Sequence, residues 1–544
     1  MGCCHSTEEN KNMGCKSTKE AADNVAGSGG GIHEQLMKTN KSGGVWQIYQ
    51  RGKLLGAGMT GSVHIATHRE TKKRFAIKSI NKRKLDPAQL GELKNEVDLL
   101  RRLDHPAIVR LYEVYEQGSK MYLVMQLLLG KDLGKVRLKT EREVAIVMRK
   151  IVQAIAYCHS KGICHRDIKL ENFVFTSTDK LDDIIVIDFG IGKKVHSVDL
   201  IPGGDTAKIK ETKAERKRNM KTICGTPYYM SPQVLDGRYD EKCDCWALGI
   251  MTYILIASKP PFNGKYKAEL DHAIRQGMVR YPHTMSRNAR ELISNLLKVN
   301  PNQRWSCAQA LKSKFFEDIE KDTKDQELER ATLNRMISFQ NSGKLKKLVL
   351  MVRAFNEQDA KIEKLKSTFD SLDSENTGYI TCDELKAALT RHNYSIDAKA
   401  IFESLDVNQQ GRISYTEFLA AAIGDDMEDD KEVLRKLFDS MDFTKNGKIT
   451  AADIQHLLGS DKNKFDVEEL LKEGDATGNN EISYAEFVQM MKSTNYLHIL
   501  SNAPSQAGIA SQRESGTSVN NGAGAALSVR DRVNTEEDED PSKK

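Results

Sequence analysis

The feature that most restricts how this chain can fold is an acidic loop that occurs four times between residues 373 and 486. The loops begin at Asp373, Asp406, Asp442 and Asp475, with spacings of 33, 36 and 33 residues. A repeat of this length predicts helix–loop–helix units that pack as two pairs. Each loop carries several oxygen-bearing side chains, and oxygen is the ligand atom that Ca²⁺ prefers.

Each loop resembles the EF-hand pattern D-x-[DN]-x-[DN]-G-x5-E, which predicts four calcium sites. None of the loops is ideal, because five positions depart from the pattern: Gln410, Thr444, Asp453, Thr477 and Asn480. Fewer anionic ligands predict weaker calcium binding, and the alternative is an EF-hand fold in which at least one loop stays empty. The predicted ligands are Asp373, Glu375, Thr377, Tyr379 and Glu384; Asp406, Asn408, Gln410, Arg412 and Glu417; Asp442, Thr444, Asn446, Lys448 and Asp453; and Asp475, Thr477, Asn479, Glu481 and Glu486.

A second motif is typical of the catalytic loop of phosphoryl-transfer enzymes, because residues 165–172 read H-R-D-I-K-L-E-N. Such a reaction needs a carboxylate that accepts the proton of the substrate hydroxyl, and Asp167 fits that role. Lys169 would lie against the moving phosphate and favour a Ser or Thr acceptor. Asn172, five residues after Asp167, would hold magnesium.

A glycine-rich loop near the start predicts contact with phosphate oxygens, because glycines let backbone N–H groups approach them. Dinucleotide-binding folds share this motif, but there the loop opens a helix, whereas here a strand follows it. Lys78 ends a strand that reads F-A-I-K and would hold the α and β phosphates. In the next predicted helix, Glu96 is the expected ion-pair partner of Lys78, and Glu92 is the alternative. The predicted nucleotide contacts in the loop are Leu55, Gly56, Ala57, Gly58, Met59, Thr60, Gly61, Ser62 and Val63.

Residues 120–316 complete a second lobe. Met125 is predicted at the back of the nucleotide pocket, Asp132 on its ribose side or peptide side, and Asp188, in a D-F-G sequence, at a magnesium ion. Together these motifs resemble the eukaryotic protein kinases over residues 49–316. The resemblance implies an α+β bilobal fold, with Lys78, Glu96, Asp167 and Lys169 as catalytic groups and with ATP and Mg²⁺ as cofactors.

Two departures from that family concern the activation segment. Gln233 stands where the family has the glutamate of A-P-E, so the expected pairing with Arg304 lacks one charge and should cost stability. The segment from Asp188 to Gln233 is long and basic, which predicts a mobile insertion or a docking surface. Within it, Thr222 is a candidate phosphosite whose phosphate Arg166 could bind.

The stretch between the kinase-like region and the repeats predicts a basic amphipathic helix. Leu345, Leu348, Val349 and Val352 fall on one helical face, beside Lys344, Lys346 and Lys347. This pattern is typical of helices that calmodulin binds, although a linker helix packed on the kinase would look the same. Upstream, Ser338 lies in an R-x-x-S sequence that resembles a kinase substrate, so it is a second candidate phosphosite.

A kinase, a basic junction helix and four EF-hands in one chain resemble the calcium-dependent protein kinases of plants and protists. The resemblance implies a bilobal kinase fold followed by an all-α calmodulin-like domain, and a Ser/Thr kinase that calcium activates. The alternative is a non-catalytic calcium-responsive scaffold. Protein substrates with basic residues near the acceptor and a monomeric state are expected. The predicted segments are a lipidated N-terminus (1–45), the kinase domain (49–316), an autoinhibitory junction (318–359), two EF-hand pairs (360–428 and 429–497) and a disordered tail (501–544).

The N-terminus fits the pattern M-G-x-x-x-[ST] for myristoylation of Gly2. Palmitoylation of Cys3 and Cys4 would supply the second anchor that stable membrane binding needs. Metal binding by Cys3, Cys4 and His5, or an unmodified tail, are the alternatives. The ten cysteines are scattered, and a net charge of +6 without a basic, aromatic-rich run does not predict nucleic-acid binding. The expected location is the cytoplasmic side of a membrane and partly the cytoplasm.

Overall fold

The structure is a computed structural model, and it describes residues 38–40, 44–57, 61–177, 180–188, 193–194, 227–237, 240–317, 328–357, 360–394, 396–423, 430–458 and 465–492. The predicted lipidation residues 2–4, loop residues 58–60, candidate phosphosite Thr222 and the tail from 501 lie outside the described residues. In the part of the chain that the structure describes, no helix is long and apolar enough to span a bilayer.

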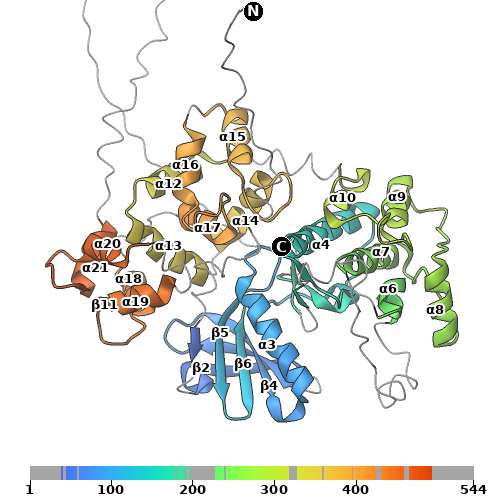
Figure 1. Ribbon diagram of the computed structural model, residues 1–544, viewed down its shortest axis with the longest axis horizontal. Coiled ribbons are helices and arrows are strands. Elements are labelled where there is room, and N and C mark those ends of the chain that lie inside the picture. Colours follow the sequence, from blue (N-terminus) through green and yellow to red (C-terminus); the bar gives the residue numbers. More distant parts are fainter. Residues whose placement is uncertain are drawn as a thin grey trace, which may run out of the picture. The chain divides into compact units, whose positions relative to one another are not determined.

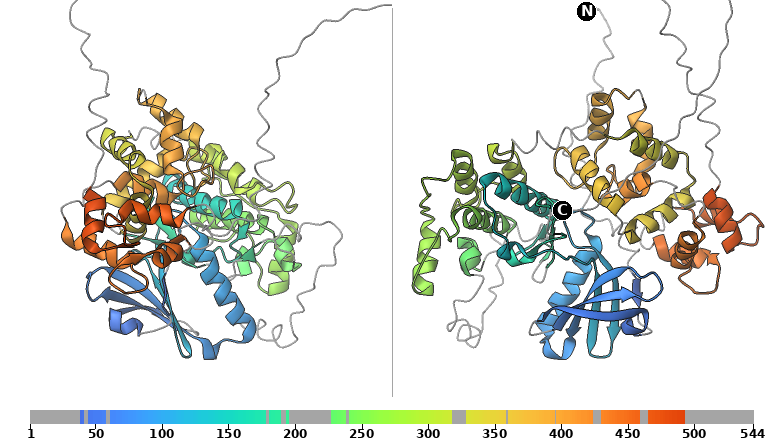
Figure 2. Two further views of the ribbon diagram at one scale, coloured as in Figure 1. Left: turned by 60° about the vertical axis from the view of Figure 1, so that its left-hand side comes forward. Right: turned by 180° about the vertical axis from the view of Figure 1, so that it is seen from behind.

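A twisted sheet forms the first lobe (Figures 1 and 2). Its strands among the described residues run in the order β1-β5-β6-β4-β3-β2, and α3 lies beside the sheet. Asp86 caps α3 by accepting a hydrogen bond from Gln89 N, and Pro87 is the first helical residue. The elements of this lobe are β1 (Lys38–Asn40), α2 (Val45–Ile48), β2 (Tyr49–Ala57), β3 (Gly61–His68), β4 (Arg74–Asn81), η2 (Lys82–Lys84), α3 (Pro87–Arg102), β5 (Leu111–Gln117) and β6 (Lys120–Met125).

The second lobe is helical and is built around two long buried helices, α4 and α7, which pack against each other. Between Gln126 and Thr140 the only helical element is a 3-10 turn. The elements are η3 (Leu133–Lys135), α4 (Glu141–Ser160), β7 (Ile163–Cys164), η4 (Leu170–Asn172), β8 (Phe173–Phe175), β9 (Ile184–Val186), β10 (Lys193–Lys194), η6 (Pro227–Tyr229), α6 (Pro232–Leu235), α7 (Lys242–Ala257), α8 (Lys267–Gln276), α9 (Arg287–Leu296) and α10 (Cys307–Leu311).

Two junction helices lead into the repeats. α12 (Arg330–Gln340) packs on α16 and α17, and α13 (Lys344–Asn356) packs on α17, α18 and α20. A backbone bridge between Ile380 and Ile413 joins the first two loops, and β11 pairs with β12 between the last two. The repeat elements are α14 (Ala360–Leu372), α15 (Cys382–Arg391), α16 (Ala398–Leu405), α17 (Tyr415–Ile423), α18 (Lys431–Met441), β11 (Ile449–Thr450), α19 (Ala451–Leu458), α20 (Val467–Gly474), β12 (Glu481–Ile482) and α21 (Tyr484–Lys492).

The structure has the predicted architecture, an α+β bilobal unit followed by an all-α domain of four helix–loop–helix units. The sheet of the first lobe and the helices of the repeats follow from two different patterns of apolar residues in the sequence. Strands β4 and β6 have buried apolar residues between turns, whereas the helices of the repeats have buried residues on one side and acidic loops at their ends. The Ile380–Ile413 bridge and the β11–β12 pair each bring two of the acidic loops side by side.

Candidate active site and calcium loops

The catalytic loop holds Asp167 in a fixed position. Its Oδ2 accepts hydrogen bonds from Lys169 Nζ at 2.5 Å and from Asn172 Nδ2 at 3.1 Å. Asn172 Nδ2 also donates to the backbone oxygen of Asp167, at 2.7 Å. The structure therefore brings these three predicted residues together. A carboxylate held in this way can accept a proton from a substrate hydroxyl, with an ammonium group beside it for the transferred phosphate.

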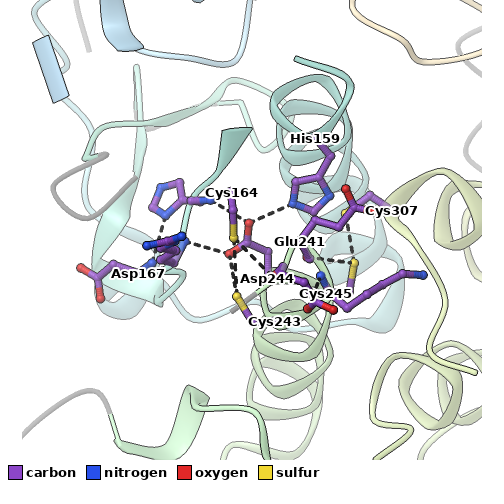
Figure 3. Close-up of polar contacts among 12 residues, drawn as sticks. His159, Cys164, Asp167, Glu241, Cys243, Asp244, Cys245 and Cys307 are labelled. Carbon is purple, nitrogen blue, oxygen red and sulfur yellow. Dashed lines mark hydrogen bonds and ion pairs between the residues drawn. The ribbon is translucent and has the colours of Figure 1, made fainter. Parts of the chain in front are cut away.

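A buried carboxylate on α7 positions this loop (Figure 3). Asp244 accepts hydrogen bonds from the backbone N–H groups of His165 and Arg166, each at 2.8 Å, and from His159 Nε2 at 2.9 Å. Burial alone would raise the pKa of Asp244, but the bond from His159 and the nearby positive charges outweigh it and lower that pKa. The sequence did not predict this role for Asp244, although an aspartate inside an apolar helix needs buried partners.

Lys78 on β4 reaches two carboxylates of the predicted nucleotide site, Glu96 and the predicted magnesium ligand Asp188. Its Nζ donates to Glu96 Oε1 at 3.1 Å and lies 3.9 Å from Asp188 Oδ1. Burial would lower the pKa of Lys78, but the charges of Glu96 and Asp188 outweigh it and raise that pKa. Glu92 is exposed, so Glu96 and not Glu92 is the partner. The group is suited to hold phosphate and Mg²⁺.

In the described part of the glycine loop, close packing explains why one position must be glycine. Gly61 opens β3, and a Cβ atom there would lie 1.8 Å from the backbone oxygen of Ser79, so no larger residue fits. Gly56 pairs with Val63 and Ala57 with Ser62 across the β2–β3 hairpin. The stems of the predicted nucleotide loop thus lie side by side. Residues 58–60, its tip, are outside the described residues.

Two further predicted nucleotide contacts lie in the hinge region. Met125 ends β6 and is buried. Asp132 forms a backbone bridge with Val174, and its carboxylate lies 2.7 Å from Lys135 Nζ. The turn that follows Asp132, η3, packs on η4 of the catalytic loop. These contacts place Asp132 close to the catalytic loop, which agrees better with the peptide side of the site.

All four acidic loops share one hydrogen-bond pattern. In each loop, the carboxylate at the first position accepts from the backbone N–H groups of the fifth and sixth positions. The carboxylate at the twelfth position accepts from those of the third and ninth. Asn480 has a φ of 61°, so it adopts the left-handed conformation that glycine has in the other loops.

The predicted ligands converge within the loops. Thr477 Oγ1 donates to Glu486 Oε1 at 2.9 Å and lies 3.4 Å from Asp475 Oδ1, so the first, third and twelfth positions of the fourth loop meet. Thr444 makes the corresponding contacts in the third loop. A cluster of carboxylate and hydroxyl oxygens fits Ca²⁺. The seventh positions of the first pair also meet, because the guanidinium of Arg412 lies 3.9 Å from the ring centre of Tyr379.

The loops differ in their electrostatics. Burial raises the pKa of Asp373 and of Glu417 to about 7, so these carboxylates of the first pair lack a compensating charge. In the fourth loop, hydrogen bonds from Ser483 lower the pKa of Glu486 to about 2. A divalent cation would supply the missing positive charge in the first pair, so the residues present there fit calcium.

Gln233, which stands where the kinase pattern has glutamate, forms the predicted contact with Arg304. Arg304 Nη2 donates to Gln233 Oε1 at 2.8 Å, and Gln233 Nε2 donates to the backbone oxygen of Val299 at 2.8 Å. Arg304 is fully buried over the ring of Trp246, and burial lowers its pKa to about 10. The predicted hydrogen bond is confirmed, and the guanidinium has an amide rather than a carboxylate at this position.

Comparison with known proteins agrees with this geometry. A protein kinase domain is recognised over residues 49–316, and EF-hand domain pairs over residues 362–423 and 431–492. Calcium-dependent protein kinase 5 of Plasmodium falciparum is 32% identical over 473 residues, which cover 84% of this chain and 79% of that protein. Calcium-dependent protein kinase 33 of Arabidopsis thaliana is 32% identical over 466 residues, which cover 82% of this chain and 85% of that protein.

Proposed function

This chain belongs to the calcium-dependent protein kinases, and from that premise we propose that calcium frees its kinase domain by making the EF-hand domain capture the junction segment 318–359. The chain is a Ser/Thr protein kinase, its kinase domain implies ATP and Mg²⁺, and its EF-hands imply Ca²⁺. The four groups Lys78, Asp167, Asn172 and Asp188 are all present and in place, which disfavours a non-catalytic scaffold.

The apolar face of α13 supports this proposal. Leu345, Leu348, Val349 and Val352 are all buried. The helix packs on α17 of the first EF-hand pair and on α18 and α20 of the second. Both pairs therefore hold the same helix, as calmodulin-like domains hold their target helices. Burial of these four side chains gives capture a large hydrophobic contribution.

Polar contacts hold the same helix at its start. The Glu473 carboxylate accepts hydrogen bonds from Leu345 N at 2.9 Å and Lys346 N at 3.3 Å. Lys346 Nζ donates to Met491 O at 2.7 Å, and Lys347 Nζ to Ser404 O at 3.3 Å. The basic residues of the junction are thus occupied by the EF-hand domain. While captured, they are unable to face the substrate groove of the kinase.

The first EF-hand pair also contacts the kinase domain. The Asp104 carboxylate accepts hydrogen bonds from Thr416 N and Thr416 Oγ1, each at 2.9 Å, at the start of α17. Lys150 of α4 forms an ion pair with Asp370. Thr416 is next to the predicted ligand Glu417, and Asp370 is three residues before Asp373. Calcium ligands and docking contacts share short segments, which supports the first pair as a major contributor to the switch.

At low calcium we propose that residues 333–352 lie on the kinase instead, with Lys344, Lys346 or Lys347 at the acidic substrate groove and Ser338 near it. Calcium then has to bind the captured state more tightly than the blocked one. A change from almost all inactive to almost all active requires roughly 5 kcal/mol of differential binding. Several loops acting together supply that more easily than one.

The decisive experiment compares full-length and truncated protein. A chain that ends before residue 318 should phosphorylate a basic peptide equally well in chelator and in calcium. The double variant Glu384→Gln and Glu417→Gln should need more calcium or lose activation, because it weakens the first pair. Equal activity of the full-length protein in chelator and in saturating calcium would contradict the mechanism.

Membrane attachment is a separate proposal that rests on the sequence pattern at Gly2, Cys3 and Cys4. Myristoylation of Gly2 gives marginal binding, and palmitoylation of the two cysteines adds the second anchor on the cytoplasmic side. Gly2→Ala should move the protein to the soluble fraction, and Cys3→Ser with Cys4→Ser should weaken retention. Unchanged fractionation of both variants would refute the proposal.

Three finer points extend the proposal. Glu171 and Asp132 are the acidic residues that would attract an arginine three residues before the acceptor, and a peptide library tests this preference.

Thr222 is proposed as an activating phosphosite for which Arg166 is the partner, and mass spectrometry of active enzyme tests it. The chain is proposed to act as a monomer, which sedimentation tests.

A further inference from the structure

Two thiols that phosphoryl transfer does not use lie beside the carboxylate that positions the catalytic loop (Figure 3). Cys245 follows Asp244 on α7, and Cys307 is the first residue of α10. Their Sγ atoms are 3.7 Å apart, and both side chains are buried. The contact joins two helices that are 62 residues apart in the sequence. Two thiols in contact need only a small movement to form a disulfide.

A histidine completes this group. Ligand atoms of His159, Cys245 and Cys307 all lie within 4.8 Å of one another, and His159 Nε2 is bonded to Asp244. The hydrogen bond with Cys307 is the largest influence on the pKa of Cys245 and lowers it, with help from His159 and against the effect of burial. Burial would lower the pKa of His159, but the Asp244 contact and the charge of Cys245 outweigh it and raise that pKa. Of the two thiols, Cys245 therefore gives up its proton more readily.

We propose that Cys245 and Cys307 are a thiol–disulfide switch that a hydroperoxide oxidises. Cys245 gives up its proton and its sulfur attacks one peroxide oxygen, the O–O bond breaks, and the leaving oxygen takes up that proton and departs as an alcohol or water while Cys245 becomes a sulfenic acid. Cys307 sulfur then attacks Cys245 sulfur, the S–S bond forms, and the sulfenic oxygen leaves as water with the Cys307 proton. Two thiols lose two electrons in total, and the peroxide gains them. Both sulfurs are buried, so the switch requires local opening of α10, which has only five residues.

Oxidation acts on catalysis through the backbone next to Asp244. Closing the sulfur–sulfur distance from 3.7 Å to about 2.05 Å draws Cys245 toward α10. It also removes a thiol whose ligand atom lies within 4.8 Å of that of His159, the residue bonded to Asp244. Both changes disturb the carboxylate that accepts from His165 N and Arg166 N. Cys245 and Cys307 are positioning residues here, and the oxidised enzyme transfers phosphate more slowly.

The chain contains a matched control pair on the other side of Asp244. Cys164 and Cys243 are also buried, with Sγ atoms 3.5 Å apart. The pKa of Cys164 is raised by its hydrogen bond with Cys243 and by burial. The pKa of Cys243 is also raised, because burial and Asp244 outweigh its bond with Cys164. Because neither thiol of this pair has a lowered pKa, we expect it to react more slowly with peroxide than Cys245 and Cys307, although its sulfur atoms are slightly closer.

The test treats the full-length protein with hydrogen peroxide, blocks free thiols, and maps disulfide-linked peptides by mass spectrometry without reduction. We expect a link between the peptides that contain Cys245 and Cys307, a loss of turnover, and recovery of both after a thiol reductant. This mapping uses the unchanged sequence, so it does not depend on whether a variant folds. Absence of this link, or a Cys164–Cys243 link formed equally fast, would overturn the proposal.

Variants then separate the switch from a purely structural role. In Cys307→Ala the resolving thiol is missing, so peroxide should leave a sulfenic acid on Cys245 that a dimedone probe labels. In Cys164→Ala the switch is intact, so peroxide should still form the Cys245–Cys307 link. For each variant the measured quantity is the ratio of turnover with and without peroxide, which does not depend on its basal turnover. An equal loss in unchanged protein and in Cys307→Ala, both restored by reductant, would contradict the disulfide as the cause.

Discussion

At the residue scale, Asp167 accepts hydrogen bonds from Lys169 and Asn172, which hold its carboxylate in place as the general base. Asp167→Asn keeps the shape of the side chain but removes the base. Turnover on a Ser-containing peptide should fall by at least about 10²-fold, since general base catalysis contributes about that much. ATP binding, measured by calorimetry, should remain because Lys78 and its partners are unchanged. Turnover near that of the unchanged protein would remove Asp167 from the mechanism.

Gln233 gives a prediction about stability. Gln233→Glu should place a carboxylate beside the buried guanidinium of Arg304 and stabilise the helical lobe by about 1 kcal/mol. The melting temperature should rise, although the bond from Gln233 Nε2 to Val299 O is lost. Gln233→Ala is the matched control and should lower it. If both variants melt at the same temperature, Arg304 is satisfied by its backbone partners alone.

The sequence predicted the role of a residue where the reaction requires that residue type at that spacing. It predicted less where the role depends on which side chains the fold buries and brings together. Lys78, Asp167 and Asn172 stand in motifs whose spacing the reaction requires. The choice between Glu96 and Glu92 needed the structure, because both lie on one helix and only burial separates them. Asp244 begins the sequence D-C-W-A-L-G, which is typical of the helical lobe but does not predict this role. Its role depends on backbone N–H groups of the catalytic loop, and these have no signature in the sequence.

At the element scale, the start of α13 gives a matched pair of variants on α20. Glu473 accepts from two backbone N–H groups of α13, whereas Glu469 forms an exposed ion pair with Lys344. Glu473→Gln should weaken capture by about 1 kcal/mol and raise the half-activating calcium concentration by about fivefold. Glu469→Gln should have little effect, because exposed ion pairs contribute little. The measurement is a calcium titration of kinase activity, and equal shifts in both variants would exclude helix capping as the cause.

The helical face of α13 was predictable, but its partner was not. Leu345, Leu348, Val349 and Val352 follow the spacing of one helical side, and all four are buried. The same pattern would suit a helix on the kinase, so periodicity alone left both possibilities open. Lys346 is also buried, with its Nζ bonded to Met491 O. The sequence does not predict a buried lysine here, because its backbone partner comes from a residue 145 positions away.

At the scale of the whole molecule, the ion pair between Lys150 and Asp370 tests whether kinase and first EF-hand pair stabilise each other. Its side chains are only 11% and 17% exposed. A double-mutant cycle with Lys150→Met and Asp370→Asn should give a coupling energy of roughly 1–2 kcal/mol in calcium, from thermal unfolding of the full chain. The exposed pair Arg435–Asp439, within one helix, is the control and should give a coupling energy near zero. Equal coupling in both cycles would mean that the first contact does not join the domains.

The contact between Asn376 and the kinase has a consequence for how the calcium threshold is measured. Asn376 lies inside the first acidic loop, and its Oδ1 accepts from Gln153 and from Arg149 of α4. Thermodynamic reciprocity then requires that docking on α4 strengthens calcium binding by the same factor by which calcium strengthens docking. An excised EF-hand domain would therefore report a threshold that the intact chain does not have. We therefore expect a helix of the kinase domain to contribute to the calcium sensitivity of the intact chain.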